Sequence, residues 1–188
     1  MSSDRQSLRS ELRLRRQQLS DREQDAAASA LLDVLRSQVP LQSNDKVALY
    51  LANDGEISPA DLCQWCWQQN IQVYLPVLDG KALVFARYEQ DSDWQKNRFG
   101  ILEPIDPNPI TGADLDWVFM PLVGFDQKGD RLGMGGGFYD RTFEHKAATT
   151  KLIGLAHDCQ EVPLLPTASW DVPLSGILTP TRFINCER

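Results

Sequence analysis

Residues 117 to 143 read WVFMPLVGFDQKGDRLGMGGGFYDRTF, and this stretch decides the fold. It starts with an apolar run, 117 to 123, whose length suits a buried strand. A polar turn at 126 to 130 leads into the glycine-rich segment 131 to 137, and a helix is expected to begin near Phe138. The order strand, glycine-rich loop, helix favours an α/β domain with an anion site where the helix begins.

The glycine-rich loop favours an anion as its guest, most often a phosphate. Glycines let the backbone approach a ligand, and a helix that follows directs unpaired N–H groups at the same place. Arg131 adds a cation with fork geometry, and Asp140 supplies a hard oxygen for a cation such as Mg²⁺. Rossmann and Walker A patterns do not fit, because Phe138 stands where the first needs glycine and no Lys-Ser/Thr pair follows. The alternative is a turn whose glycines only let chain segments pass closely.

The composition is that of an ordinary globular domain. The chain has 188 residues, of which 42% are hydrophobic and 24% charged, and this length suits a single domain over 1 to 188. Apolar runs are too short to cross a membrane, and the N-terminus lacks the apolar core of a signal peptide. The net charge of −7 argues against a general nucleic-acid binder. The sequence therefore predicts a cytoplasmic protein with neither membrane nor nucleic-acid partners.

Basic charge is nevertheless concentrated at the N-terminus, on a predicted helix. Arg5, Arg9, Arg13 and Arg16 recur at spacings of four, four and three, so they share one helix face. This arginine stripe is a solvated basic face, a weak RNA contact, or a surface lying over the polyphosphate of a nucleotide in the glycine-rich loop. Spacing alone leaves these three interpretations open.

The rest of the chain alternates strand and helix patterns. A capping box at Ser20 and Glu23 opens a second helix, and a strand at 46 to 52, a helix from Ser58 and a strand at 71 to 77 form a parallel unit. A helical turn is expected near Trp94. Further strands are expected at 82 to 88, 151 to 157, 175 to 178 and 182 to 184.

One acidic residue is expected at the edge of this sheet where ligands bind. The turn 53 to 57 follows the strand at 46 to 52 and delivers Glu56 to the carboxyl end of that strand. Glu56 is therefore a candidate site residue.

These details together resemble the signature of the 5-formyltetrahydrofolate cyclo-ligase family, also called 5,10-methenyltetrahydrofolate synthetases. The similarity covers nearly the whole chain. It is carried by the run from Pro121 to Arg141, the Arg5-x2-Leu8-Arg9 start, Asp54-Gly55-Glu56, Gly100-Ile101-x-Glu103-Pro104, and Gln160 followed by Pro166 and Asp171.

The resemblance implies a three-layer α/β/α fold with a largely parallel central sheet. It also implies a reaction that needs ATP as co-substrate and Mg²⁺ as cofactor. In the family, ATP phosphorylates the formyl oxygen of 5-formyltetrahydrofolate, N10 attacks the activated carbon, and phosphate leaves with formation of 5,10-methenyltetrahydrofolate. The expected partners are ATP and 5-formyltetrahydrofolate, and the expected state is a monomer or a weak dimer.

Site roles follow from the resemblance position by position. Arg131 and Tyr139 are the expected catalytic residues, and Asp140 and Asp171 the expected metal ligands. Glu56, Phe99 and Tyr139 are expected to bind the folate. The expected ATP-binding residues are Arg5, Arg9, Arg131, Leu132, Gly133, Met134, Gly135, Gly136, Gly137, Phe138 and Tyr139.

Three positions depart from the family pattern. Arg5 stands where the family commonly has lysine, so a planar fork replaces a flexible ammonium. Met134 occupies a position that is often aromatic or basic, and Phe138 replaces the first of a common tyrosine pair. Each departure is expected to change affinity without abolishing the site.

Two other functions remain open at this point. A sugar-phosphate isomerase or CoA transferase of similar architecture would need a base or carboxylate nucleophile, for which Glu56 is the candidate. A regulator that binds a nucleotide or a folate would use the same pocket without turnover.

Overall fold

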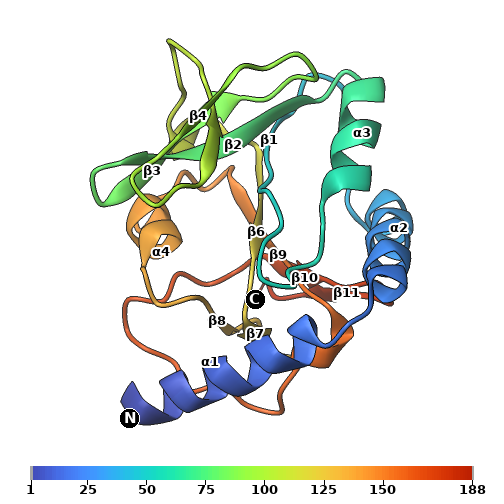
Figure 1. Cartoon of the computed structure of the whole chain (residues 1–188), viewed down its shortest axis with the longest axis vertical. Coiled ribbons are helices and arrows are strands. Elements are labelled where there is room, and N and C mark those ends of the chain that lie inside the picture. The colour runs from blue at the N-terminus through green and yellow to red at the C-terminus, as the bar shows by residue number, and fades with distance from the viewer. Residues whose placement is uncertain (1, 188) are drawn as a thin grey trace.

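A seven-stranded sheet forms the centre of the molecule, in the order β11-β10-β9-β6-β1-β2-β3 (Figure 1). The structure is a computed structural model that describes residues 2 to 187, with side chains from residue 4 onward. The five inner strands are parallel, and the edge strands β3 and β11 pair antiparallel with their neighbours. The strands are β1 (Lys46–Ala48), β2 (Gln72–Asp79), β3 (Ala82–Arg87), β6 (Trp117–Pro121), β9 (Lys151–Leu155), β10 (Gly176–Leu178) and β11 (Phe183–Asn185).

Helices cover both faces of this sheet. The helices α2 (Asp21–Gln38) and α3 (Ala60–Gln68) pack on one face, where Leu31 and Leu62 join strand residues in one core cluster. The short helix α4 (Phe138–Phe143) packs on the other face, where Phe143 is buried in a second cluster. The predicted three-layer α/β/α fold with a largely parallel sheet is confirmed. The capping box between Ser20 and Glu23 is also present.

The predicted helical turn near Trp94 is wrong, because this segment forms a hairpin. The strands β4 (Trp94–Lys96) and β5 (Leu102–Pro104) pair antiparallel in a separate two-stranded sheet. Asn97 closes the hairpin, since its Oδ1 accepts hydrogen bonds from the N–H groups of Phe99 and Ile101 at 2.9 and 3.1 Å. The predicted strand at 46 to 52 is also too long, because β1 ends at Ala48 and the chain continues outside the sheet.

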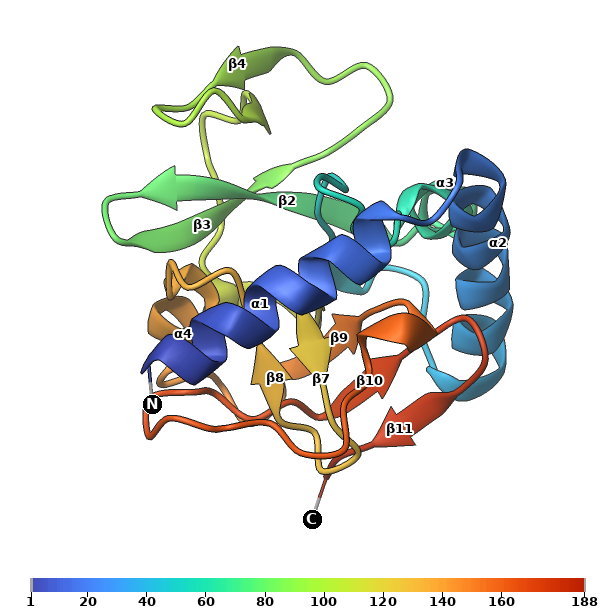
Figure 2. The same ribbon diagram turned by 60° about the horizontal axis from the view of Figure 1, so that its bottom comes forward.

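The arginine-rich helix α1 (Ser2–Gln17) lies across the carboxyl ends of the parallel strands (Figure 2). Its side chains reach the loops that follow three of these strands: Arg13 contacts Asp54 after β1, Arg16 contacts Leu122 after β6, and Arg15 contacts Cys159 after β9. Its residue Leu12 is fully buried. The helix therefore closes the sheet edge at which α/β proteins bind ligands.

No helix within residues 2 to 187 has both the length and the apolar content needed to cross a membrane. Short elements complete the chain: the strand pair and one 3₁₀ turn follow β6 and β9 at the carboxyl edge of the sheet, and the other 3₁₀ turn precedes β6 at the opposite edge. They are the strand pair β7 (Gly124–Phe125) and β8 (Arg131–Leu132) and the 3₁₀ turns η1 (Gly112–Asp114) and η2 (Asp158–Gln160).

Candidate active site

The glycine-rich loop runs from β8 into α4 and lies against the arginine stripe of α1. Gly137 caps α4 with φ of 72°, in the left-handed region that favours glycine. The Nε of Arg9 donates to the carbonyl oxygen of Gly133 at 2.8 Å. A Cβ atom on Gly135 would lie 3.4 Å from the guanidinium carbon of Arg9. The loop therefore presents its backbone directly beside a cation.

Arg131 enters the same site from β8 and is 8% exposed. Its Nη2 donates to Oδ1 of Asp140, which also accepts the N–H of Val172 at 2.9 Å. The Nε of Arg131 is buried and has no hydrogen-bond partner among the described residues. Because a buried unpaired donor costs about 1 to 3 kcal/mol, an anion oxygen at this position would be stabilised.

Arg5 forms the outer wall of the site. It donates to Oδ2 of Asp171 at 3.0 Å and to the carbonyl of Pro166 at 3.0 Å. Burial, followed by the positive charge of Arg5, lowers the pKa of Arg9. Burial is the larger cause, and the repulsion between Arg5 and Arg9 adds to it. A polyphosphate is the kind of ligand that relieves such repulsion.

Asp140 and Asp171 lie in this cluster, and each carboxylate is bound by an arginine, Arg131 and Arg5 respectively. No group of three or more His, Cys, Asp or Glu side chains within residues 2 to 187 could hold a metal ion. Proteins usually bind Mg²⁺ through one or two carboxylates together with substrate phosphates. The two carboxylates thus fit an ion that arrives with a nucleotide, and do not fit a site made by protein alone.

Glu56 lies in the loop after β1, as the sequence predicts, and faces a neighbouring part of the site. Its Oε1 accepts the N–H of Asn53 at 3.0 Å, which fixes the carboxyl group on its own turn. Burial raises its pKa to about 6, against the lowering effects of this hydrogen bond and of Arg16. Burial raises the pKa of Tyr139 as well, and the charge of Glu56 adds to this rise. The carboxyl group of Glu56 therefore lies near enough to the phenol of Tyr139 to affect its ionisation.

Phe99 is at the tip of the β4–β5 hairpin and is 59% exposed. Its ring meets that of Phe138 edge to face, with 6.4 Å between centroids. Tyr139 instead stacks on Phe143 at 6.4 Å. Guanidinium groups cover the outer two rings: Arg98 is 5.0 Å from the centroid of Phe99, and Arg141 is 5.0 Å from that of Phe138. The hairpin thus brings an exposed aromatic wall to the start of α4.

The arrangement as a whole joins a phosphate-type site to an aromatic site that carries a carboxyl group. The model of the 5-formyltetrahydrofolate cyclo-ligase family matches residues 1 to 180. The chain belongs to this family. The matched residues include every site residue named above, from Arg5 to Asp171.

Relatives and solved structures agree with this assignment to the cyclo-ligase family. The chain is 43% identical over 180 residues to 5-formyltetrahydrofolate cyclo-ligase of Haemophilus influenzae, covering 93% of this chain and 96% of that protein. It is 37% identical to the Escherichia coli K12 protein of the same name, covering 91% and 97%. The solved structure of Aquifex aeolicus 5,10-methenyltetrahydrofolate synthetase has a TM-score of 0.86 at 27% identity, covering 98% of this chain and 93% of that one.

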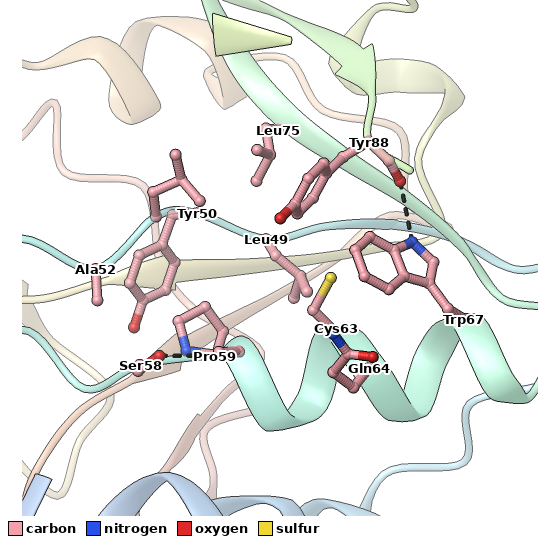
Figure 3. Close-up of a pocket in the computed structure, with 12 residues that line it drawn as sticks. Leu49, Tyr50, Ala52, Ser58, Pro59, Cys63, Gln64, Trp67, Leu75 and Tyr88 are labelled. Atoms are coloured by element: carbon pink, nitrogen blue, oxygen red, sulfur yellow. Dashed lines mark hydrogen bonds between the residues drawn. The ribbon is translucent and has the colours of Figure 1, made fainter. Parts of the chain in front are cut away.

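A cavity of about 110 Å³ lies on the α3 side of the chain after β1, away from the glycine-rich loop (Figure 3). Its lining includes Tyr50, Cys63, Trp67 and Tyr88, and the indole N–H of Trp67 donates to the carbonyl of Tyr88 at 3.0 Å. Within the described residues that line it there is neither an arginine nor a carboxylate. This lining does not resemble a phosphate site.

The structure also shows contacts of residues to which the sequence assigned no role, although Asp54 belongs to the Asp54-Gly55-Glu56 part of the family signature. Asp54 accepts hydrogen bonds from Arg13 and Arg16, and His157 contacts the carbonyl of Gly55 at 3.2 Å. The stripe spacing indicates that Arg13 and Arg16 face the same side as Arg5 and Arg9, which is the available signal for the first contact. No sequence pattern indicates the role of His157.

Proposed function

We propose that the protein catalyses the ATP-dependent conversion of 5-formyltetrahydrofolate to 5,10-methenyltetrahydrofolate, with release of ADP and phosphate. The formyl oxygen attacks the γ-phosphorus of ATP, and ADP leaves. N10 of the folate then attacks the activated formyl carbon and gives up its proton to solvent, and the C–O bond breaks with loss of phosphate. One observation supports the proposal beyond family membership: Arg131 has a buried, unpaired Nε–H, and its Nη1 would lie 3.7 Å from a Cβ on Gly133, in the glycine-rich loop that Arg9 also binds.

The nucleotide half of the site follows from this observation. Arg5 and Arg9 would hold ATP phosphates, and the backbone from Leu132 to Phe138 would surround them. Arg131 would stabilise the charge that develops on the transferring phosphoryl group, because its free Nε–H can donate there without desolvation at that moment. Asp140 and Asp171 would hold Mg²⁺ with the nucleotide, and the ion would neutralise phosphate charge during transfer. Phosphoryl transfer then requires chiefly positioning and electrostatic stabilisation from the protein.

The folate half of the site contains the carboxyl group and the aromatic rings. Glu56 would accept hydrogen bonds from N–H donors of the folate ring system, and the phenol of Tyr139 would donate to the reacting formyl group. Phe99 and Phe138 would form the wall against the planar ring, which is consistent with their edge-to-face contact and with the exposure of Phe99. The two halves meet at α4, where Phe138, Tyr139 and Asp140 are consecutive.

Absorbance tests this function directly, because methenyltetrahydrofolate absorbs in the near ultraviolet and 5-formyltetrahydrofolate does not. We expect the band to appear when folded protein, ATP, Mg²⁺ and 5-formyltetrahydrofolate are combined. It should be absent without ATP, and its growth should match the ADP released mole for mole. Binding of both ligands with no band would indicate a non-catalytic nucleotide- or folate-binding protein. The cytoplasmic location, the monomeric or weakly dimeric state and the lack of nucleic-acid or membrane partners stay predictions.

A further inference from the structure

Arg16 is the largest of the fully buried side chains and has 0% exposure, although it belongs to a stripe of charged residues. It is in the last turn of α1. Its Nε donates to the carbonyl of Asp54 at 2.7 Å, and its Nη2 donates to Oδ2 of the same residue at 2.9 Å. Two of its donors therefore bind the turn that presents Glu56.

The remaining contacts of Arg16 reach two other segments. Its Nη1 donates to the carbonyl of Leu122 at 2.9 Å, in the chain just after β6. Its Nη2 lies 3.8 Å from Sδ of Met134, in the glycine-rich loop. The same nitrogen thus touches the carboxylate of Asp54 and the thioether of Met134. One buried guanidinium connects the expected folate turn, the strand end and the expected nucleotide loop.

The turn that presents Glu56 is also packed tightly on the backbone of α1 at this point. A Cβ atom on Gly55 would lie 2.9 Å from the backbone carbon and oxygen of Arg16, and Gly55 has φ of 76°. The carbonyl of Gly55 contacts Nε2 of His157 at 3.2 Å and accepts the side-chain N–H of Gln24 at 3.0 Å. The turn therefore cannot shift without a change in the contacts of Arg16.

The charge of Arg16 makes its contacts costly to lose. A buried cation is stable only while it is paired and hydrogen-bonded, and here Asp54 provides the paired charge. Arg13 shares that carboxylate at 2.7 Å. A lysine could keep the charge of Arg16, but its single ammonium lacks the planar fork that serves separate acceptors.

We propose that Arg16 is a positioning residue that links the nucleotide loop to the folate turn, so that each ligand strengthens the binding of the other. This inference rests on the proposed function. A nucleotide that orders the glycine-rich loop would fix Met134, which is 53% exposed in this structure, and would thereby fix the Nη2 of Arg16. The fixed guanidinium would hold Asp54, and with it Glu56, in the position that binds folate. Reciprocity then requires the same effect in the opposite direction.

Calorimetry with 5-formyltetrahydrofolate, in the presence and absence of a non-hydrolysable ATP analogue, measures this link. We expect the analogue to lower the Kd for the folate by about fivefold or more in the unaltered protein. In Arg16→Met and Arg16→Lys the analogue should change the Kd for the folate by less than about twofold, which means that the two ligands are no longer measurably coupled. The matched control is Arg15→Lys, because Arg15 is exposed on the same turn and pairs with Glu11 at the surface. The control should keep the full factor.

A pH profile separates positioning from a general loss of structure. The groups that face Glu56 are Arg16 from α1, Asp54 from its own turn, and Tyr50 and Tyr139. Arg16→Met removes the cation that favours the ionised carboxylate, so the acidic limb of kcat/KM for folate should move to higher pH. Arg16→Lys keeps the charge and should leave the limb in place while it lowers kcat. A poorly folded variant would lose amplitude without this difference between Met and Lys.

The outcomes are distinct. If the unaltered protein forms methenyltetrahydrofolate and Arg16→Met keeps the full coupling factor, the role of Arg16 is refuted and the proposed function stands. Absence of coupling in the unaltered enzyme, with turnover intact, refutes the role as well. If the folded, unaltered protein shows no turnover, the proposed function fails and the inference fails with it.

Discussion

At Glu56 burial has more effect than the positive charge nearby, since its pKa is raised to about 6 although Arg16 lowers it. A carboxyl group with a native pKa above its ordinary value stabilises the fold at pH below that ordinary value. This contribution is lost as pH rises through about 6. The ionised form, which we propose accepts hydrogen bonds from folate, is therefore the form that the fold favours less.

A pH dependence follows from this property of Glu56. We expect kcat/KM for 5-formyltetrahydrofolate to rise between pH 5 and 7 with a midpoint near 6, because the carboxylate ionises in that interval. Glu56→Gln keeps the shape of the side chain and cannot ionise, so it should lower kcat/KM and flatten this limb. Steady-state rates across the pH range provide the measurement. An unchanged limb in Glu56→Gln would assign the titration to another group.

Arg131 differs from the other site arginines because it is both buried and incompletely hydrogen-bonded. We expect Arg131→Ala to lower kcat/KM at least tenfold, equivalent to about 1.4 kcal/mol or more, because a charge-assisted contact to phosphate is lost. The substitution also leaves Asp140 without its ion pair. Arg131→Lys is the control for this charge, and thermal melts identify any loss of fold. Kinetics like those of the unaltered enzyme would remove Arg131 from the mechanism.

At the scale of elements, α1 places cations along one edge of the sheet, and those nearest its N-terminus face the expected polyphosphate. We expect the double variant Arg5→Ala with Arg9→Ala to raise the KM for ATP by more than the KM for folate. Arg15→Ala is the matched control on the same helix, since Arg15 pairs with Glu11. Steady-state titration of each substrate gives both constants. A larger effect on the KM for folate would contradict the assignment of this helix to phosphate.

The β4–β5 hairpin is held to the main sheet by a buried carboxylate. Glu103 is 4% exposed, and its Oε2 accepts the N–H of Leu78 at 2.8 Å and the side-chain N–H of Asn97 at 3.1 Å. We expect Glu103→Ala to loosen the hairpin and to raise the KM for folate severalfold while it leaves the KM for ATP within about twofold. Phe99→Ala should give the same pattern, because it removes the wall that the hairpin carries. Equal changes in both KM values would indicate general unfolding.

Long elements are easier to predict from the sequence than short ones, because their apolar positions repeat more often. The helix α3 and the strand β2 are predictable because they repeat their apolar positions over nine and eight residues. The strand β4 is not, because it has three residues, all exposed, and its pairing is decided by the turn at Asn97. Short elements of this kind take their conformation from tertiary contacts.

Sequence spacing also predicts only part of the candidate site. The helical period identifies which face of α1 carries Arg5, Arg9, Arg13 and Arg16, and the structure places them along the loops of one sheet edge. The period does not give depth, so it could not distinguish the fully buried Arg16 from the other three arginines, which are half-buried. It also could not tell which acid beside Gly55 pairs with arginine. Asp54 does so, whereas Glu56 is turned towards its own backbone.

For the whole molecule, a nucleotide should act as a clamp between α1 and the loops of the sheet. ATP at about 100 times its Kd is expected to stabilise the fold by about 2.7 kcal/mol, which raises the Tm of a chain of this size by about 5 to 10 °C. Differential scanning fluorimetry with Mg²⁺ and without folate measures this rise. AMP lacks the phosphates that the arginines would bind, so it should give a much smaller shift. Equal shifts with AMP and ATP would show that the polyphosphate makes no use of α1.

The position of α1 has a consequence for the order in which the protein is made. This helix precedes every strand of the sheet in the chain, yet Arg5 pairs with Asp171, which follows 166 residues later, and Arg16 donates to the carbonyl of Leu122. When α1 is made, the segments that contain Asp171 and Leu122 have not yet been synthesised, so its arginines lack these two acceptors. The acceptors of α1 are therefore all made after the helix itself, and we expect its arginine face to complete its contacts only once the segments that follow β6 and β9 have folded.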